Sequence, residues 1–143
     1  MLPNVVRGVH YRILGRTAAG SRINVLTLPQ SPVLPHILIR HDGGTPESSD
    51  NRASVARITF EARAKEWEAA LALALEIREL WRPAEEVVDG WHGDVFVPAI
   101  PTRGIPAQTV HFSGAQVNAE PIWVPDEVTG TPRYSLPILI NYS

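Results

Sequence analysis

The sequence contains no cysteine and a single lysine, and it has no long apolar run. Without cysteine there is no disulfide framework, no thiolate metal site and no cysteine nucleophile. A helix that crosses a bilayer needs about 20 apolar residues, so no association with a membrane is expected. The first residues also lack the apolar segment of a secretory signal, which predicts a cytoplasmic location during synthesis.

Signatures of common chemistry are absent as well. The sequence has no Gly-x-Gly-x-x-Gly, no P-loop and no Gly-x-Ser-x-Gly. Its five histidines are not paired at a spacing that places two ligands on one helix face. We therefore expect no metal, no cofactor and no catalytic residue. The formal charge of −2 gives no overall attraction to nucleic acid, although a local basic patch stays open.

One short segment, Gly90–Asp94, leaves an enzymatic interpretation open. It places His92 and Asp94 beside an aromatic residue. The two side chains could form a general base with its orienting carboxylate. They could equally lie in a turn in which Asp94 bonds backbone amides. No serine or cysteine nucleophile lies nearby in the sequence, so the turn is the favoured interpretation.

What is present fits one soluble domain over residues 1–143. The 44% of hydrophobic and 20% of charged residues are typical of globular proteins. Thirteen prolines lie mostly between the patterned segments and indicate ordered loops. Residues 83–108 hold several of them, which forbids a long central strand. We expect an extended arm there, with a short strand near 94–97.

The first half of the chain predicts a helix, two strands and a hairpin. Val5, Val9 and Ile13 recur every four residues, which indicates a helix over residues 3–16 that Asn4 could cap and Gly8 weakens. Strands are expected at 22–28 and 36–41. The polar residues 42–51 are rich in turn formers and predict a long hairpin tip before the next strand.

Residues 52–64 show the clearest alternation in the sequence. Ala56, Ile58, Phe60 and Ala62 alternate with charged or polar residues, which predicts a strand with one buried and one wet face. A helix over residues 65–82 follows directly and ends at a proline. Its predicted apolar stripe, at helical spacing, consists of Trp67, Ala70, Leu71, Ala74, Ile77 and Trp81.

The last third predicts strands around a turn. Residues 109–124 have strand character with a break at Gly114, and residues 132–143 form the closing strand. Pro137 in that strand indicates an edge or a bulge, because proline has no N–H to donate. The whole order predicts an α+β fold: a mostly antiparallel mixed sheet with two helices packed on it.

Three stretches together resemble the tail terminator proteins of long-tailed bacteriophages, the family of the lambda-type terminator. "LPHILIRHDGG" is similar to the family's first hairpin strand and its Gly-rich turn. "ARITFEARAKEWEAALALALEIRELW" resembles its alternating strand that runs into a long Ala/Leu/Glu helix. "PIWVPDEVTGTPRYSLPILI" resembles its closing hairpin. The arm at 83–108 looks longer than is usual in the family.

The resemblance implies a structural role in the virion. Such proteins form a hexameric ring that caps the tail tube, ends tube polymerisation and offers a docking surface to the head and neck. The implied partners are further copies of the chain, the tail tube protein, a neck connector or stopper protein, and genomic DNA that passes non-specifically through the lumen. Candidate subunit or tube contacts are Asp42, Glu47, Asp50, Arg52, Pro98, Pro101, Arg103, Arg133 and Tyr134.

Three alternatives stay open. The chain could be another phage neck protein, which acts in head completion or head–tail joining. It could be a small α+β enzyme or ligand-binding domain that uses His92 and Asp94. It could also be an oligomeric domain with a different role. Under the ring hypothesis the closing strand, with Pro137, is expected at an edge that a neighbouring subunit covers.

Overall fold

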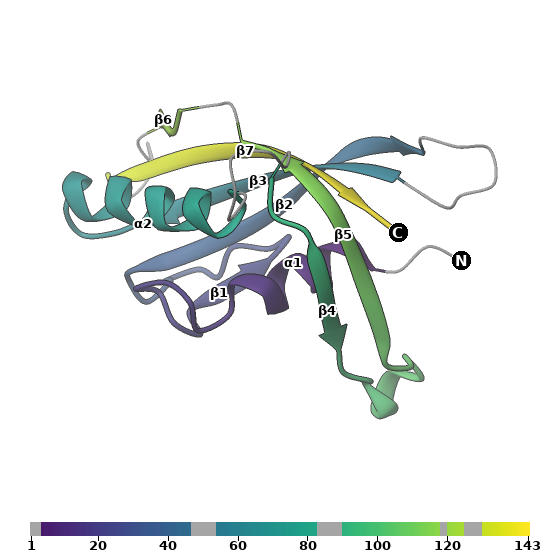
Figure 1. Ribbon diagram of the computed structural model, residues 1–143. Helices are drawn as coiled ribbons and strands as arrows, with labels where there is room; N and C mark the ends of the chain where they lie inside the picture. The colour runs from purple at the N-terminus through teal and green to yellow at the C-terminus, as the bar shows by residue number, and fades with distance from the viewer. Residues whose placement is uncertain (1–3, 47–53, 83–89, 118–119, 125–129) are drawn as a thin grey trace.

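The computed structural model describes residues 4–46, 54–82, 90–117, 120–124 and 130–143 (Figure 1). Over these residues the chain has an α+β fold in which a seven-stranded mixed sheet, curled into a half-barrel, dominates two α-helices. The elements are α1 (Val5–Ile13), β1 (Ile23–Val25), β2 (His36–Pro46), β3 (Ser54–Arg63), α2 (Trp67–Leu80), β4 (Gly93–Val97), the 3₁₀ turn η1 (Pro101–Arg103), β5 (Gln108–Gln116), β6 (Ile122–Trp123) and β7 (Arg133–Tyr142).

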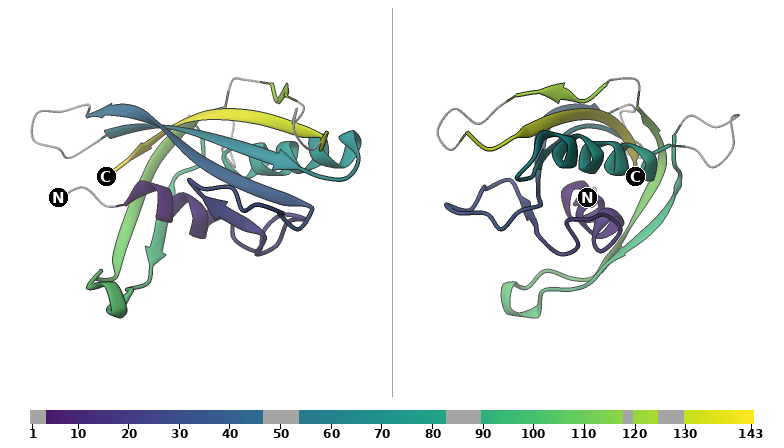
Figure 2. Two further views of the ribbon diagram at one scale, coloured as in Figure 1. Left: turned by 180° about the vertical axis from the view of Figure 1, so that it is seen from behind. Right: turned by 90° about the vertical axis from the view of Figure 1, so that its left-hand side faces the viewer.

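The strands follow the order β1-β2-β3-β7-β5-β4, and β6 lies beside the first part of β7. The β1–β2 pair is parallel and the other described pairs are antiparallel. Figure 2 shows the sheet curving around both helices. Helix α2 contacts the central strands β3 and β7, whereas α1 contacts β4, β1, β2 and β5. Neither described helix is long and apolar enough to span a membrane.

Helix α1 begins where its cap predicts. The Asn4 side chain accepts a hydrogen bond from the Arg7 N–H at 3.2 Å, which satisfies a free amide of the first turn. Gly8 lowers the helix propensity of this segment, but it has a role in packing. A Cβ there would lie 2.9 Å from Val110 Cγ2, so only glycine lets α1 approach β5 this closely.

Helix α2 is confirmed, but its buried face is partly wrong in the prediction. Trp67 is 51% exposed, because it lies in the first turn, where residues 65–69 are all exposed. Leu73 is buried, whereas Leu71 is only half-buried. Trp81 at the other end is fully buried and lies among Phe60, Trp91 and Phe112, with ring centroids 5.4 to 6.3 Å away. These aromatic rings join α2 to both halves of the sheet.

The expectation that the closing strand is an edge is wrong. Strand β7 lies in the middle of the sheet, paired along its whole length with β3. Pro137 is tolerated there for a local reason. In the described part of the chain, β6 pairs with Tyr134 and Ser135 and β5 pairs only from Leu139 onward. Among the described residues, no strand therefore pairs with Pro137 on that side, so its missing N–H leaves no acceptor there without a partner.

Strands β4 and β5 form a ribbon that projects from the body of the molecule (Figure 1). Its tip contains η1 and an isolated bridge between Ile100 and Ile105. The described part of the predicted arm, residues 90–108, is therefore this ribbon strand and its tip. The break expected at Gly114 is a register shift between Phe112 and Gly114, where β5 pairs with β7.

Candidate functional site

The outer face of the central strands carries a network of charged side chains. Alternate residues of β3 point away from the helices, and Glu61 lies at the centre of this face. The Glu61 carboxylate contacts Arg63 at 3.0 Å, Arg40 at 3.2 Å and Arg133 at 3.6 Å. Asp42 extends the network, since it pairs with Arg40 at 3.3 Å and accepts a hydrogen bond from the Thr59 hydroxyl.

The prediction that this face of β3 is exposed to solvent is wrong for most of its residues. Thr59, Glu61 and Arg63 are all buried, and Arg57 alone of the predicted wet set on β3 is exposed. The Arg63 side chain is only 3% exposed. Its Nε and Nη1 atoms have no hydrogen-bond partner in the described part of the chain. Glu61 is therefore the main group that compensates a deeply buried cation.

His36 lies opposite Arg63 on the neighbouring strand and is buried. Its Nε2 is 2.8 Å from Asn24 Oδ1, and its Nδ1 has no partner among the described residues. Burial, and then the Arg63 guanidinium, lower the pKa of His36 below its ordinary value of 6.5. The folded protein therefore favours the neutral ring.

We expect this histidine to make the protein less stable in mild acid. As the pH falls through about 6.5, the unfolded chain takes up a proton that folded His36 resists, so the free energy of unfolding decreases. His36→Gln should reduce this decrease between about pH 7.5 and about pH 5.5 in urea titrations. Part of the decrease should remain in this variant, because burial, and then Arg7, also lower the pKa of His10. His92→Gln, at an exposed position, is the control, and an equal pH dependence in all three proteins would contradict the assignment.

The predicted contact residues fall into separate groups. Glu47, Asp50 and Arg52 lie outside the described residues. Asp42 and Arg133 belong to the charged network, and Arg133 also donates to the Val124 carbonyl at 2.8 Å. Tyr134 packs against the Trp123 ring with centroids 5.2 Å apart. Pro101 and Arg103 are exposed at the tip of the β4–β5 ribbon, and the half-buried Pro98 accepts a hydrogen bond from Arg7 at 3.0 Å.

Among the described strands, β1 and β4 end the strand order, and exposed apolar side chains lie on β4 and in the connection that follows β1. Leu26 and Val33 lie in the connection that follows β1, and Val33 is 69% exposed. Leu26 has a φ of 68°, a left-handed conformation that is unfavourable for a branched side chain. Its N–H donates to the Ile39 carbonyl at 2.8 Å, which fixes the backbone there. On β4, Phe96 is 65% exposed.

The proposed His92–Asp94 pair does not form in the structure. Asp94 pairs instead with His111 Nδ1 across the β4–β5 ladder, at 2.6 Å, and both side chains are exposed. His111 is also backbone-paired with Ser143. Among the described residues no side-chain hydrogen bond joins that serine to the His111 imidazole. Only the strand register brings these residues together, and no sequence spacing indicates it.

Comparison with known proteins adds no family assignment. No protein-family model matches the chain, and no curated protein is significantly similar to it. Within the described ranges there is also no group of three or more histidine and acidic side chains that could hold a metal ion. The candidate functional features are therefore surfaces: the charged network, the two apolar edges, and the exposed apolar residues of β6, Ile122 and Trp123.

Few features of the sequence predict these surfaces. Glu61 and Arg63 stand two residues apart on one strand, which places them on the same face but says nothing of burial. Phe96 stands between two core valines of β4, so alternation alone points it outward. That signal was available in the sequence, and it would have placed an exposed phenylalanine on the ribbon.

Proposed function

We propose that this chain is the tail terminator of a long-tailed bacteriophage. Copies of it close into a hexameric ring on the end of the tail tube, stop tube polymerisation and offer a docking surface to the neck of the DNA-filled head. The three stretches that resemble the terminator family are the source of this proposal. In the fold they correspond to β2, to the β3–α2 unit, and to β6 with β7.

The exposed apolar residues at the two open edges carry the ring part of the proposal. Leu26 and Val33 lie in the connection that follows the edge strand β1, and Phe96 lies on the edge strand β4. Unpaired strand edges with exposed apolar side chains promote aggregation of a free monomer. The two edges differ from each other, and a contact between different surfaces of successive subunits is heterologous. Such contacts form a closed ring when the rotation between successive subunits returns to the first subunit after a whole number of copies.

The axial partners need further surfaces. The β6 residues Ile122 and Trp123 are exposed and lie apart from both edges in the strand order. Arg103 and Pro101 are exposed at the ribbon tip. We assign these surfaces to the tube protein and the neck connector. The formal charge of −2 suits a DNA passage, because a lumen rich in arginine would bind phosphates and retard the DNA.

Electron microscopy of particles assembled without this protein tests the proposal. We expect abnormally long tail tubes without heads, because nothing ends the polymerisation. Tails of normal length beside separate filled heads would assign the protein to head–tail joining instead. Normal infectious particles would overturn both assignments.

Complementation with edge variants tests the ring contacts. Phe96→Asp and Val33→Asp each place a charge on one edge, which should leave the fold intact and abolish the restoration of normal tails. Trp67→Asp is the matched control, because it changes an exposed aromatic residue of α2 that lies on neither edge. Full complementation by both edge variants would contradict β1–β4 contacts, and circular dichroism of each variant verifies folding.

A further inference from the structure

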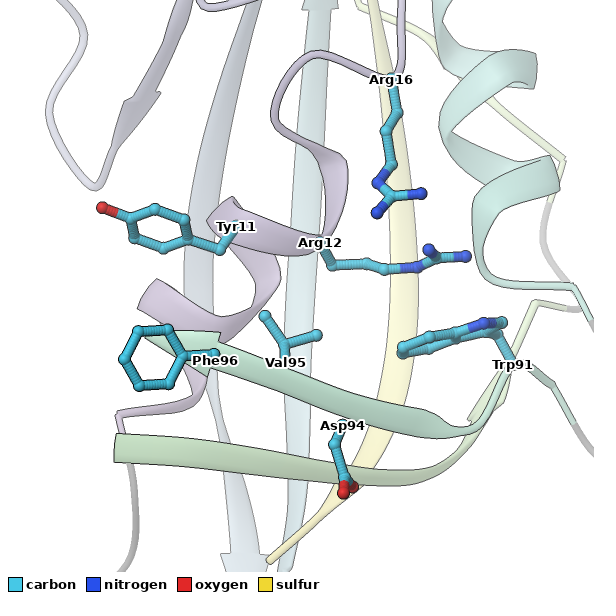
Figure 3. A pocket seen from close by; sticks show the side chains of 7 residues that line it. All are labelled: Tyr11, Arg12, Arg16, Trp91, Asp94, Val95 and Phe96. Atoms are coloured by element: carbon cyan, nitrogen blue, oxygen red, sulfur yellow. The ribbon is translucent and has the colours of Figure 1, made fainter. Parts of the chain in front are cut away.

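A cavity of about 260 Å³ lies between α1 and the edge strand β4 (Figure 3). It is separate from the charged network on the outer face of the sheet and from the β6 surface. Helix α1 contributes Tyr11 and Arg12, and Arg16 follows three residues after the end of the helix. The opposite side is aromatic and aliphatic. The residues that matter for its chemistry are Tyr11, Arg12, Arg16, Trp91, Val95 and Phe96.

Two guanidinium groups meet at this cavity. Arg12 stacks on the Trp91 ring at 3.8 Å, and its Nη2 donates to the Leu80 carbonyl at 2.9 Å. Its Nε atom is buried and has no partner in the described part of the chain. Figure 3 shows Arg12 between the Trp91 ring and the guanidinium of Arg16. Arg12 is thus held in place by the ring and by one hydrogen bond, and its Nε–H donor stays unused among the described residues.

In the part of the chain that the structure describes, no carboxylate forms an ion pair with either guanidinium. Burial, and then the neighbouring Arg16, lower the pKa of Arg12, as expected for two cations side by side. Among the described residues the Arg16 guanidinium has neither a hydrogen-bond nor an ion-pair partner. Asp94 also lines the cavity, but Figure 3 shows its carboxylate directed away from both arginines. It pairs with His111 instead.

The rest of the cavity is suited to an apolar group. Tyr11 and Phe96 lie at one end, and Val95 lies between Phe96 and Trp91 (Figure 3). Pockets for drug-sized ligands have volumes of roughly 300 to 1,000 Å³, so this cavity is suited to a smaller molecule. Guanidinium groups bind carboxylates and phosphates through paired, charge-assisted hydrogen bonds.

We propose that this cavity binds a small anion, with a carboxylate or phosphate head at Arg12 and Arg16 and a compact apolar body against Val95 and Phe96. The site belongs to a single subunit. Its lining includes Phe96, which is also proposed above as a ring contact, so the titration below uses the unassembled subunit. Binding there tests this site and not the terminator role.

Titration of the purified protein with benzoate and with phenyl phosphate tests the proposal, and the two probes separate carboxylate from phosphate recognition. The readout is the indole N–H signal of Trp91 in nuclear magnetic resonance spectra at constant ionic strength, assigned with Trp91→Phe. We expect a saturable shift with at least one of the two anions. Benzamide, a neutral molecule of the same shape as benzoate, and acetate, which lacks the ring, should bind more weakly than the better anion.

Arg16→Gln removes the exposed guanidinium without disturbing the bond from Arg12 to Leu80. It should weaken binding of the better anion at least about tenfold, the effect of losing one charge-assisted hydrogen bond. Arg57→Gln, at an exposed position on β3, is the matched control and should leave the affinity unchanged. The proposal is wrong if neither anion gives a saturable shift, if benzamide or acetate binds as tightly, or if Arg16→Gln binds like the parent protein.

Discussion

Replacing Glu61 by glutamine should lower the free energy of unfolding by about 3 to 5 kcal/mol, the range for removing one partner of a buried ion pair. The carboxylate is the main counter-charge of Arg63, whose side chain is 3% exposed and whose Nε and Nη1 atoms have no described partner. Because globular proteins are stable by only about 5 to 15 kcal/mol in total, this single change should bring the protein close to unfolding. Urea denaturation monitored by circular dichroism measures the effect.

Three further variants separate the buried charge from a general effect of losing an ion pair. Glu79→Gln removes the exposed pair with Arg82 and should cost less than about 1 kcal/mol. The double variant Glu61→Leu, Arg63→Met removes the buried anion and the buried cation together. It should be more stable than Glu61→Leu alone, because no uncompensated charge then remains at Arg63. A double variant less stable than Glu61→Leu would show that Arg63 contributes through packing and not through its charge.

Replacing Trp81 by alanine should lower the free energy of unfolding by about 3 to 5 kcal/mol, the range for a large aromatic residue lost from a core. The Trp81 side chain is fully buried among Phe60, Trp91 and Phe112. Its loss opens a cavity where α2, β3 and β5 meet. Thermal and urea unfolding give the magnitude.

Trp67→Ala is the matched control for this prediction. It removes the same side chain from the same helix, but at a position that is 51% exposed. We expect a change within about 0.5 kcal/mol, as for surface substitutions. Similar losses for the two variants would contradict the role of the aromatic cluster, because Trp67 lies outside it and alanine has the higher helix propensity.

Local chemistry made several elements predictable. The cap at Asn4, the alternation of Ala56 to Ala62 and the helical pattern before Pro83 each depend on neighbours within a few residues. Such signals predict α1, β3 and α2 with only small errors at their ends. The α+β class follows from the order of these elements.

The candidate surfaces could be predicted less well, because each depends on which strands pair. A strand's position in the sheet is set by long-range pairing, which the sequence of that strand does not state. Pro137 favoured an edge, yet β7 is central, between β3 and β5. The proline is tolerated because neither β5 nor β6 pairs with it in the described part of the chain. The Asp94–His111 pair likewise exists only through the β4–β5 register.

The sequence by itself determined the fold class, the two helices and the alternation that gives β3 its core face. Only the tertiary structure decided that the other face of β3 is also buried around Glu61, that β1 and β4 are the open edges, and that Arg12 and Arg16 share a cavity with Trp91. The physical reason is the range of the interactions. Periodicity and capping act within a few residues, whereas burial, edges and cavities arise where segments far apart in the chain pack together.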